Sequence, residues 1–514
     1  MITESAMARW RVYFTEPGRC WPEFRDPVAA RLAARLPVLR RKHDRREGQP
    51  FLLGPDGLPD ARVNAFFCTY PMSARDRDTW RKYAYALGLW LNFLAARRRG
   101  WAQAAVEDVE AFKFWRMADP ANPRRVAAGT LKGNLIALNV FYGWAALGHG
   151  VANPVRMREV RTASAGGGRM SVAEMAAGPV GIRSRDVRWF TPAGYRRWRD
   201  IGLRGFGLDG LEDPRWRGRG EQRDAAFADG LFETGLRISE WAGVLDVELP
   251  GDDPDRAFST CWLADSCAKG GLGRRYWMPR PALTGVLSYV EGARARAVRR
   301  ARARGLYARL ADGLVVERVH ANRRLRVRDA AGAVGSVALD ALDPPTRGRL
   351  LRVGPAGLEP LAVWLNEDGL PRAAHGWQHS FAAANARIAR LGLDGFACSA
   401  HRLRHSFALR WYSVGKLLYD ARFAHLDPEE LRDFRVQFGD TWQLVQTMLG
   451  HRSVVTTMDV YLEPFRHLDV ELLLEQTIGI PVAALLDAVW RTHPRVATDP
   501  LVPDPRRDGD GPPR

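Results

Sequence analysis

The stretch MLGHRSVVTTMDVYLEP, from Met448 to Pro464, places a histidine directly after a glycine and a tyrosine shortly before a proline. Two β-branched pairs lie between His451 and Tyr461. A histidine and a tyrosine this close can form a buried hydrogen-bonded pair, or they can be a nucleophile and the group that assists it. The other motifs of the chain decide between these two interpretations.

Length and composition predict a soluble globular protein. The chain has 514 residues, of which 46% are hydrophobic and 26% charged, and this length suits about two to four domains. We find no uninterrupted apolar run of about 18 residues, so the sequence predicts no transmembrane helix. The start, MITESAMARWRVYF, lacks the charged and apolar regions of a signal peptide. We therefore expect a cytoplasmic protein without a membrane partner.

The sequence gives no sign of a bound metal or cofactor, and we predict neither. The chain has no GxxxxGK[ST] loop and no HExxH motif. Its cysteines are scattered and show no CxxC spacing, so we expect reduced and mostly buried thiols. They are Cys20, Cys68, Cys261, Cys267 and Cys398.

The charge balance favours a polyanionic partner. The chain has 77 basic and 58 acidic residues, a net charge of +19, and arginine and lysine supply most of the affinity of proteins for nucleic-acid phosphates. Arginine dominates, which can also reflect a GC-rich genome, so the charge alone favours DNA or RNA without deciding it. The six lysines are Lys42, Lys82, Lys113, Lys132, Lys269 and Lys416.

The first half of the chain predicts a basic arm or small subdomain, a helical domain and a linker. We assign residues 1–63 to the arm and residues 64–161 to the helices, the first of which we expect to start at a capping serine, Ser73. The small, Gly-rich residues 162–185 predict a linker. The apolar stripe of the first helix predicts ordinary helical core; it consists of Trp80, Tyr83, Leu87, Trp90, Leu91 and Leu94.

The second half predicts a larger, mostly helical domain over residues 186–480, followed by a C-terminal helix and a disordered tail over 481–514. STCWLADS and RRYWMPRP, joined by CAKGGLG, predict a β-hairpin. Residues 293–352 combine an Ala/Arg helix with two or three short alternating strands, and we interpret them as an insertion. The predicted fold class is mainly α with a small β-sheet (α+β).

Four stretches of this second half contain residues suited to phosphate chemistry. They are TGLRISE, AKGGLGRR, HRLRHS and LGHRSVVTTMDVY. In this order they resemble the tyrosine recombinase (phage integrase) family, whose pattern is Arg, Lys, His-x-x-Arg, His or Trp, and Tyr. All six positions are filled. The matching residues are Arg237, Lys269, His401, Arg404, His451 and Tyr461.

The chemistry of phosphodiester cleavage explains these residue types. Two guanidiniums can hold the non-bridging oxygens of a phosphate and stay charged at any relevant pH. Stabilisation of developing charge is usually the largest catalytic contribution. A tyrosine has an unperturbed pKa of about 10, so it must lose its proton as it attacks, and a nearby histidine can accept it. A lysine on a hairpin can protonate the leaving oxygen.

The resemblance implies a role for each residue. Tyr461 attacks the scissile phosphate and forms a 3′-phosphotyrosine link, and Lys269 protonates the freed 5′-hydroxyl. Arg237 and Arg404 bind the phosphate. His401 assists proton transfer, and His451 forms a hydrogen bond with the phosphate.

Each residue also has an ordinary structural interpretation. Arg237 can be a surface ion-pair residue, Lys269 a solubilising turn lysine and Tyr461 a core tyrosine. We expect Glu240 to brace the region of Arg237 and His405 to serve packing. Two further tyrosines, Tyr412 and Tyr419, precede His451 rather than follow it. The occurrence of four motifs in the family's order favours the catalytic interpretation.

The resemblance spans roughly residues 64–480 and implies an architecture. The helical domain looks like the family's core-binding domain, which together with the catalytic domain forms a C-shaped clamp around double-stranded DNA. The implied assembly is a homotetramer on two DNA sites and a monomer or weak oligomer in free solution. A helix over 470–479 or 482–493 is expected to pack against a neighbouring subunit, or within its own core. A bacterial, nucleoid-associated location and an accessory directionality factor are further implications.

Three alternatives stay open at this stage. The chain can be a transposon-encoded recombinase, a type IB topoisomerase-like enzyme, or a DNA-binding protein that has lost turnover. The insertion at 293–352 is longer than the family's usual connection. Its arginines can contact the DNA backbone or form a solvated helix face; they are Arg294, Arg296, Arg299, Arg300, Arg302 and Arg304.

Overall fold

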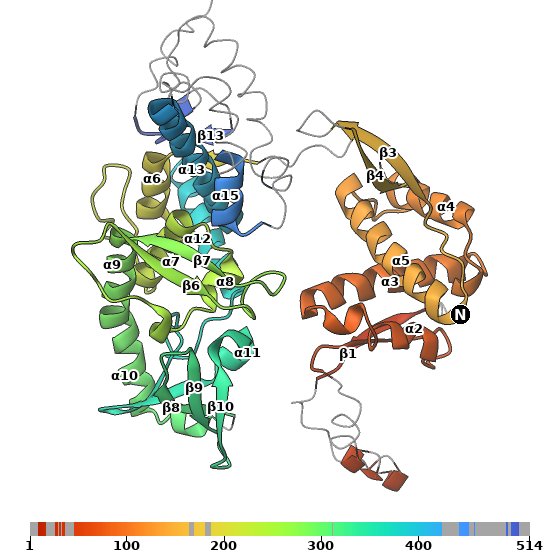
Figure 1. Cartoon of the computed structure of the whole chain (residues 1–514), viewed down its shortest axis with the longest axis horizontal. Coiled ribbons are helices and arrows are strands. Elements are labelled where there is room, and N and C mark those ends of the chain that lie inside the picture. Colours follow the sequence, from red (N-terminus) through yellow and green to blue (C-terminus); the bar gives the residue numbers. More distant parts are fainter. Residues whose placement is uncertain are drawn as a thin grey trace, which may run out of the picture. The chain divides into compact units, whose positions relative to one another are not determined.

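The structure is a computed structural model in which the chain forms two compact units, Met1–Arg183 and Ser184–Arg514. The fold is mainly α with small β-sheets, as the sequence predicted (Figure 1). Within the part of the chain that the structure describes, no helix is both long and apolar enough to span a membrane. The described residues are 9–16, 26–28, 30–31, 33–35, 46–163, 169–179, 187–310, 312–423, 441–451, 457, 490–491 and 495–502.

The first unit is built on helices with two small antiparallel strand pairs. Its helices are α2 (Ala61–Phe66), α3 (Arg77–Ala96), α4 (Val106–Met117) and α5 (Ala128–His149). Its strands are β1 (Arg11–Phe14), β2 (Pro50–Leu53), β3 (Met157–Ala163) and β4 (Arg169–Met175).

The apolar stripe of α3 is core, as predicted. Trp80 and Trp90 are buried, and the Trp90 indole donates a hydrogen bond to the Tyr142 hydroxyl of α5 at 2.9 Å. The predicted helix start is wrong by three residues, because the side chain of Asp76, not Ser73, accepts the Thr79 amide at 2.6 Å.

Two predicted segments of this unit contain strands that the sequence did not predict. The segment predicted as an arm or small subdomain, residues 1–63, contributes to the core, because β1 pairs with β2 and Leu52 of β2 is fully buried. Gly88 of α3 makes room for this strand pair, since a Cβ there would lie 2.8 Å from Val12 Cγ2. The linker ascribed to residues 162–185 is partly a hairpin, because β3 pairs with β4 from Met157–Met175 to Ala163–Arg169.

The second unit contains the remaining elements. Its helices are α6 (Pro192–Gly202), α7 (Glu221–Thr234), α8 (Ile238–Ala242), α9 (Arg280–Tyr289), α10 (Ala295–Ala303), α11 (Pro344–Arg347), α12 (Gly376–Arg390), α13 (Ala400–Phe423) and α15 (Thr441–Leu449). Its strands are β5 (Trp189–Phe190), β6 (Phe258–Leu263), β7 (Arg274–Pro279), β8 (Leu314–Val319), β9 (Arg324–Arg328), β10 (Val334–Ala338), β11 (Leu350–Gly354), β12 (Gly357–Pro360) and β13 (Val496–Ala497).

An aromatic cluster forms the centre of this unit. The Phe227 and Trp377 rings stack with centroids 3.4 Å apart, and Trp364 meets both rings edge-on. Such pairs join α7, α12 and the segment after β12 in one core. The predicted hairpin is confirmed, since β6 and β7 pair from Phe258–Pro279 to Leu263–Arg274.

The predicted insertion forms a larger sheet than expected. Its five strands lie in the order β10-β9-β8-β11-β12, with β8 and β11 parallel, and they extend to Pro360. In Figure 1 this sheet lies at the opposite end of the unit from α13 and α15, with β6 and β7 between them.

The arginines of the insertion divide into two groups. Arg294 is buried and donates to the Ala362 carbonyl at 3.1 Å, and Arg302 binds the Leu358 carbonyl at 3.2 Å and Glu359 at 3.3 Å. These two arginines therefore attach the α9–α10 segment to β12 and to the residues after it. Neither interpretation from the sequence, DNA contact or a solvated helix face, anticipated this role. The exposed ones are Arg296, Arg299, Arg300 and Arg304.

Part of the predicted disordered tail is ordered. Strand β13 pairs in parallel with β5, and Asp499 accepts the Arg197 side chain at 3.1 Å. The pairing buries the apolar side chain of Val496 and gives the β5 backbone a hydrogen-bonding partner. The predicted late helices at 470–479 and, except for 490–491, 482–493 lie outside the described residues.

Candidate active site

Arg237 lies at the sharp turn between α7 and α8. Helix α7 ends at Gly235, whose φ of +65° is open to glycine at little cost. Arg237 then caps α8: its backbone amide donates to Glu240 Oε2 and its guanidinium to Glu240 Oε1, both at 2.9 Å. The side chain of Arg237 is only 18% exposed.

Glu240 is the buried centre of the site. Its carboxylate is fully buried and also accepts Arg274 at 2.8 and 3.3 Å and the Lys269 amide at 3.4 Å. Burial alone would raise the pKa of Glu240, but the hydrogen bonds from Arg274 and the charges of Arg274, Arg404 and Arg237 lower it to about 2. Glu240 is therefore ionised, and it braces Arg237 as the sequence predicted.

Arg404 approaches the same place from the first turns of α13. It is almost fully buried, and it donates to the Gly235 carbonyl, which is 169 residues away in the sequence. It also donates to the Leu449 carbonyl at 2.6 Å and contacts His451 Nε2 at 3.2 Å. The ends of α7 and α15 thus fix the plane of the Arg404 guanidinium.

His451 follows the end of α15 and is held as a neutral imidazole. An arginine only donates, so His451 Nε2 accepts from Arg404 and the ring proton sits on Nδ1, which faces Thr457 Oγ1 at 2.9 Å. Burial and the charges of Arg404, Arg237 and Arg274 lower the pKa of His451 to about 3. Both ring nitrogens are therefore engaged within the protein.

Arg274, at the start of β7, is a further member of this cluster that sequence reasoning missed. Its terminal nitrogens bind Glu240, while its buried Nε has no hydrogen-bond partner among the described residues. Its side chain crosses Gly450, where a Cβ would lie 2.4 Å from Arg274 Cδ. Its place just after the hairpin turn was visible in the sequence, but nothing distinguished it there from the many other arginines.

The other predicted site residues are less closely joined. Lys269 is exposed at the β6–β7 turn, and its backbone amide alone reaches Glu240. His401 is exposed on the first turn of α13, where it borders a cavity of about 430 Å³ together with Cys398 and His405. Tyr461 lies outside the described residues. Of the other tyrosines considered, Tyr412 is core, buried with its ring 4.6 Å from that of Trp442.

The arrangement can bind an anion. Three guanidiniums, those of Arg237, Arg274 and Arg404, surround one carboxylate, so positive charge is in excess. The imidazole of His451 is neutral, so it leaves the net charge of this cluster unchanged. Among the residues that the structure describes, no group of three or more His, Cys, Asp or Glu is placed to hold a metal ion.

Comparisons with known proteins find similarity in structure only. No protein-family model matches the chain, and no curated protein matches its sequence. A crystal structure of XerH site-specific recombinase bound to palindromic difH substrate, a post-cleavage complex, is 13% identical, with 89% of this chain and 98% of that chain covered and a TM-score of 0.43. The pre-cleavage complex of XerH with difH is also 13% identical, with 88% and 97% covered and a TM-score of 0.41. XerA recombinase is 14% identical, with 82% and 98% covered and a TM-score of 0.28.

Proposed function

We propose that this chain is a tyrosine recombinase, an enzyme that cleaves and rejoins double-stranded DNA through a 3′-phosphotyrosine link. The observation that carries the proposal is the convergence of Arg237, Arg404 and His451 around one buried carboxylate. These residues come from three distant segments, and each had been singled out from the sequence for phosphate chemistry.

The geometry supports phosphate binding. Arg237 and Arg404 are held by Glu240 and by main-chain carbonyls, so their positions are set before a substrate arrives. Pre-set donors that face developing negative charge are usually the main source of catalysis in such reactions. Glu240 keeps the arginines together without neutralising them all.

In the proposed reaction, the Tyr461 oxygen attacks the scissile phosphorus and the bond to the 5′ oxygen breaks. The phenolic proton goes to His401 or to water relayed by it, and the Lys269 ammonium gives a proton to the departing 5′ oxygen. One ester bond forms as one breaks, so the link conserves the bond energy. Attack by a 5′-hydroxyl of a partner strand then reverses the step and rejoins the DNA.

We further propose that the enzyme is a site-specific recombinase of the integrase type, which integrates or excises a mobile element. In this proposal the two units grip a duplex from opposite sides as a C-shaped clamp, and four copies assemble on two DNA sites.

Covalent trapping tests the proposed function. DNA that flanks the gene is tiled as nicked duplexes, from which the short cleaved fragment diffuses away. Wild type is expected to give an SDS-resistant protein–DNA adduct that Tyr461→Phe abolishes and the matched control Tyr419→Phe retains. Arg404→Ala is expected to reduce the adduct by at least about a hundredfold.

Other outcomes point elsewhere. An adduct that survives Tyr461→Phe contradicts the assigned nucleophile. Relaxation of supercoiled DNA by monomers, without pairing of two sites, identifies a topoisomerase-like enzyme. Tight DNA binding on every tile without any adduct supports a binding protein that has lost turnover.

A further inference from the structure

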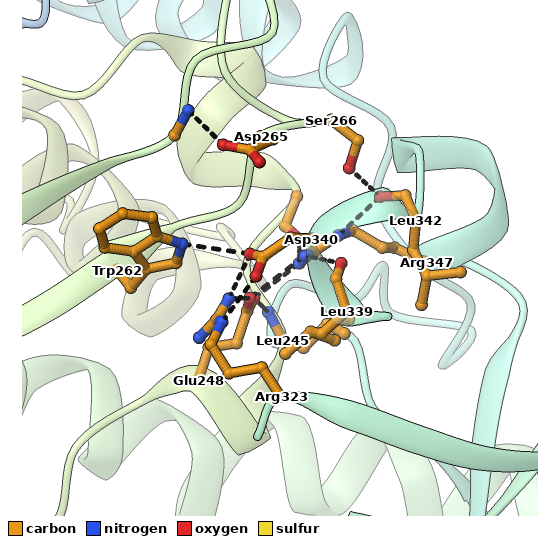
Figure 2. Close-up of polar contacts among 12 residues, drawn as sticks. Leu245, Glu248, Trp262, Asp265, Ser266, Arg323, Leu339, Asp340, Leu342 and Arg347 are labelled. Atoms are coloured by element: carbon orange, nitrogen blue, oxygen red, sulfur yellow. Dashed lines mark hydrogen bonds and ion pairs between the residues drawn. The ribbon is translucent and has the colours of Figure 1, made fainter. Parts of the chain in front are cut away.

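A polar network joins the β6–β7 hairpin to the inserted sheet. We call it the hairpin-anchoring network, and Figure 2 shows its members facing one another. It matters because the hairpin bears Lys269, whose proposed role needs an accurately placed ammonium. The network consists of Glu248, Trp262, Ser266, Arg323, Asp340 and Arg347.

Asp340, just after β10, is the direct link between the two elements. Its carboxylate accepts the Trp262 indole of β6 at 3.1 Å, and its carbonyl accepts the Ser266 amide at 3.0 Å. The Ser266 hydroxyl donates to the Leu342 carbonyl. Three hydrogen bonds therefore tie the segment that leads to Lys269 to the 340–342 turn.

Two arginines hold the 340–342 turn in place. Arg323, in the left-handed region with φ of +58°, binds Asp340 at 2.8 and 3.1 Å and Glu248 at 3.2 Å. Arg347 is 2% exposed, and each of its five N–H groups has an acceptor: the Leu342, Leu339 and Gly243 carbonyls and both Glu248 oxygens. A fully satisfied buried guanidinium gives a rigid joint.

The same network reaches α8, the helix that carries Glu240. Arg347 binds the carbonyl of Gly243, the C-cap residue of α8, and Arg237 is the N-cap residue of the same helix. A Cβ on Gly243 would lie 3.3 Å from Cys267 Sγ, so α8 also touches the lysine turn. The inserted sheet is thus fastened both to the turn of Lys269 and to the support of Arg237.

The turn itself is closed at its base. Asp265 accepts the Gly273 amide at 2.6 Å, and the Lys269 amide meets Glu240 at 3.4 Å. Cys267 and Ala268 are buried, whereas Lys269 is exposed. The backbone on the N-terminal side of Lys269 is therefore fixed, and its side chain projects from a held position.

We propose that the inserted sheet positions Lys269 for proton donation, with Asp340 and Ser266 as positioning residues. This inference rests on the proposed function, because it takes Lys269 as the acid that protonates the departing 5′ oxygen. Small displacements of a reacting group of about 1 Å lower rates by roughly a hundredfold. A loosened hairpin is therefore expected to slow the protonation of the 5′ oxygen, as a partial loss of the Lys269 ammonium would.

The test compares two substrates at the site found by covalent trapping. One is the ordinary phosphodiester, and the other has sulfur in place of the bridging 5′ oxygen. A thiolate leaves without a proton, so its departure needs no acid. The Asp340→Ala/Ser266→Ala variant is expected to cleave the ordinary substrate roughly ten- to a hundredfold more slowly than wild type. Its rate on the sulfur substrate is expected to stay within about twofold of wild type, as is that of Lys269→Ala.

Asp329→Ala is the matched control. Asp329 lies in the same sheet, at the β9–β10 turn, where its carboxylate accepts the local amides of Ala331 and Ala333. Its substitution is expected to leave both rates unchanged. Equal losses on both substrates in the double variant, or no loss on either, would overturn the inference.

Hydrogen exchange tests the anchoring itself without relying on the reaction. The amides of Ser266, Cys267 and Lys269 are expected to exchange at least tenfold faster in the double variant than in wild type and Asp329→Ala. Unchanged exchange refutes the anchoring. If exchange rises while wild type forms no adduct on either substrate, the anchoring stands and the proposed function fails.

Discussion

Glu240 holds three arginines together, and its charge is the reason that they can coexist. Replacing it by glutamine keeps the shape but leaves Arg237, Arg274 and Arg404 facing one another in a buried place. A pKa of about 2, against an ordinary 4.5, corresponds to about 3 kcal/mol of folding stability. We expect Glu240→Gln to lower the free energy of unfolding near pH 7 by about this amount, measured by urea titration.

The sign of the pH dependence follows from the lowered pKa. As pH falls, the unfolded chain takes up a proton on Glu240 near pH 4.5, whereas the folded chain does so only near pH 2. The contribution is therefore complete above pH 4.5 and is lost between pH 4.5 and 2. The difference between wild type and Glu240→Gln should shrink over this range, and a constant difference would contradict the assigned charge. Glu110→Gln, at an exposed ion pair with Lys113, should change little at any pH.

His451 should not titrate in the range in which the enzyme works. Its lowered pKa of about 3 keeps the ring neutral above about pH 4. We expect nitrogen NMR shifts of His451 to report the Nδ1–H tautomer and to stay constant from pH 5 to 9. Thr457→Val should remove the partner of Nδ1 but leave the Nδ1–H tautomer in place, because Arg404 still donates to Nε2.

The rate profile distinguishes the two histidines. His451→Gln should lower the cleavage rate at every pH. It should not change the acidic limb of the profile, the range of low pH in which the rate falls. His401→Asn should abolish that limb if His401 accepts the tyrosine proton. A shift of the limb by His451→Gln would show that His451 titrates and that the surrounding arginines do not hold it neutral.

Sequence alone could point to Arg237, Arg404 and His451 because each stands in a short motif with distinctive neighbours. Arg274 could not be found in this way, since its importance comes from contact with Glu240 and Gly450, which folding brings to it. The neutral state of His451 was equally out of reach, because its lowered pKa depends on burial and on three charges from other segments.

At the scale of elements, the turn after α7 sets the position of both phosphate-binding arginines. Gly235 has φ of +65°, and a Cβ there would lie 2.4 Å from the Phe407 ring of α13. We expect Gly235→Ala to lower the free energy of unfolding by about 2–4 kcal/mol, from backbone strain together with overpacking. It should also reduce adduct formation, because the Gly235 carbonyl orients Arg404.

Gly392→Ala is the control for this prediction. Gly392 has φ of +81° but no atom within 4 Å of an added Cβ, so its replacement adds strain without overpacking. We expect a loss of about 1 kcal/mol and unchanged adduct formation. Equal losses at the two positions would mean that the contact with Phe407 is readily relaxed.

Local sequence signals predicted the presence of helices and strands better than they predicted strand pairing or helix caps. The β6–β7 hairpin was predictable because both strands alternate and a Gly-rich turn joins them. The parallel pairing of β8 with β11 was not, because it joins strands separated by two others. Ser73 and Asp76 are both good capping residues, and only the bond to the Thr79 amide shows which of them caps α3.

At the scale of the whole molecule, each unit has a hydrophobic core of its own. The first contains Trp90 and Tyr142, and the second contains Trp364 and Trp377, with separate sets of buried neighbours. A domain with its own core can fold alone. We expect fragments 1–183 and 184–514, cut where the compact units meet in sequence, each to unfold cooperatively by circular dichroism.

DNA binding should then depend on the covalent connection. If each unit contacts phosphates, either fragment binds duplex DNA weakly, and the intact chain binds far more tightly because the second contact becomes intramolecular. The slope of log affinity against log salt should be steeper for the intact chain, since more phosphates are neutralised at once. If fragment 184–514 matches the intact chain in both affinity and slope, the first unit is not a DNA-gripping module, and the clamp is refuted while the proposed chemistry at Glu240 and its arginines can still hold.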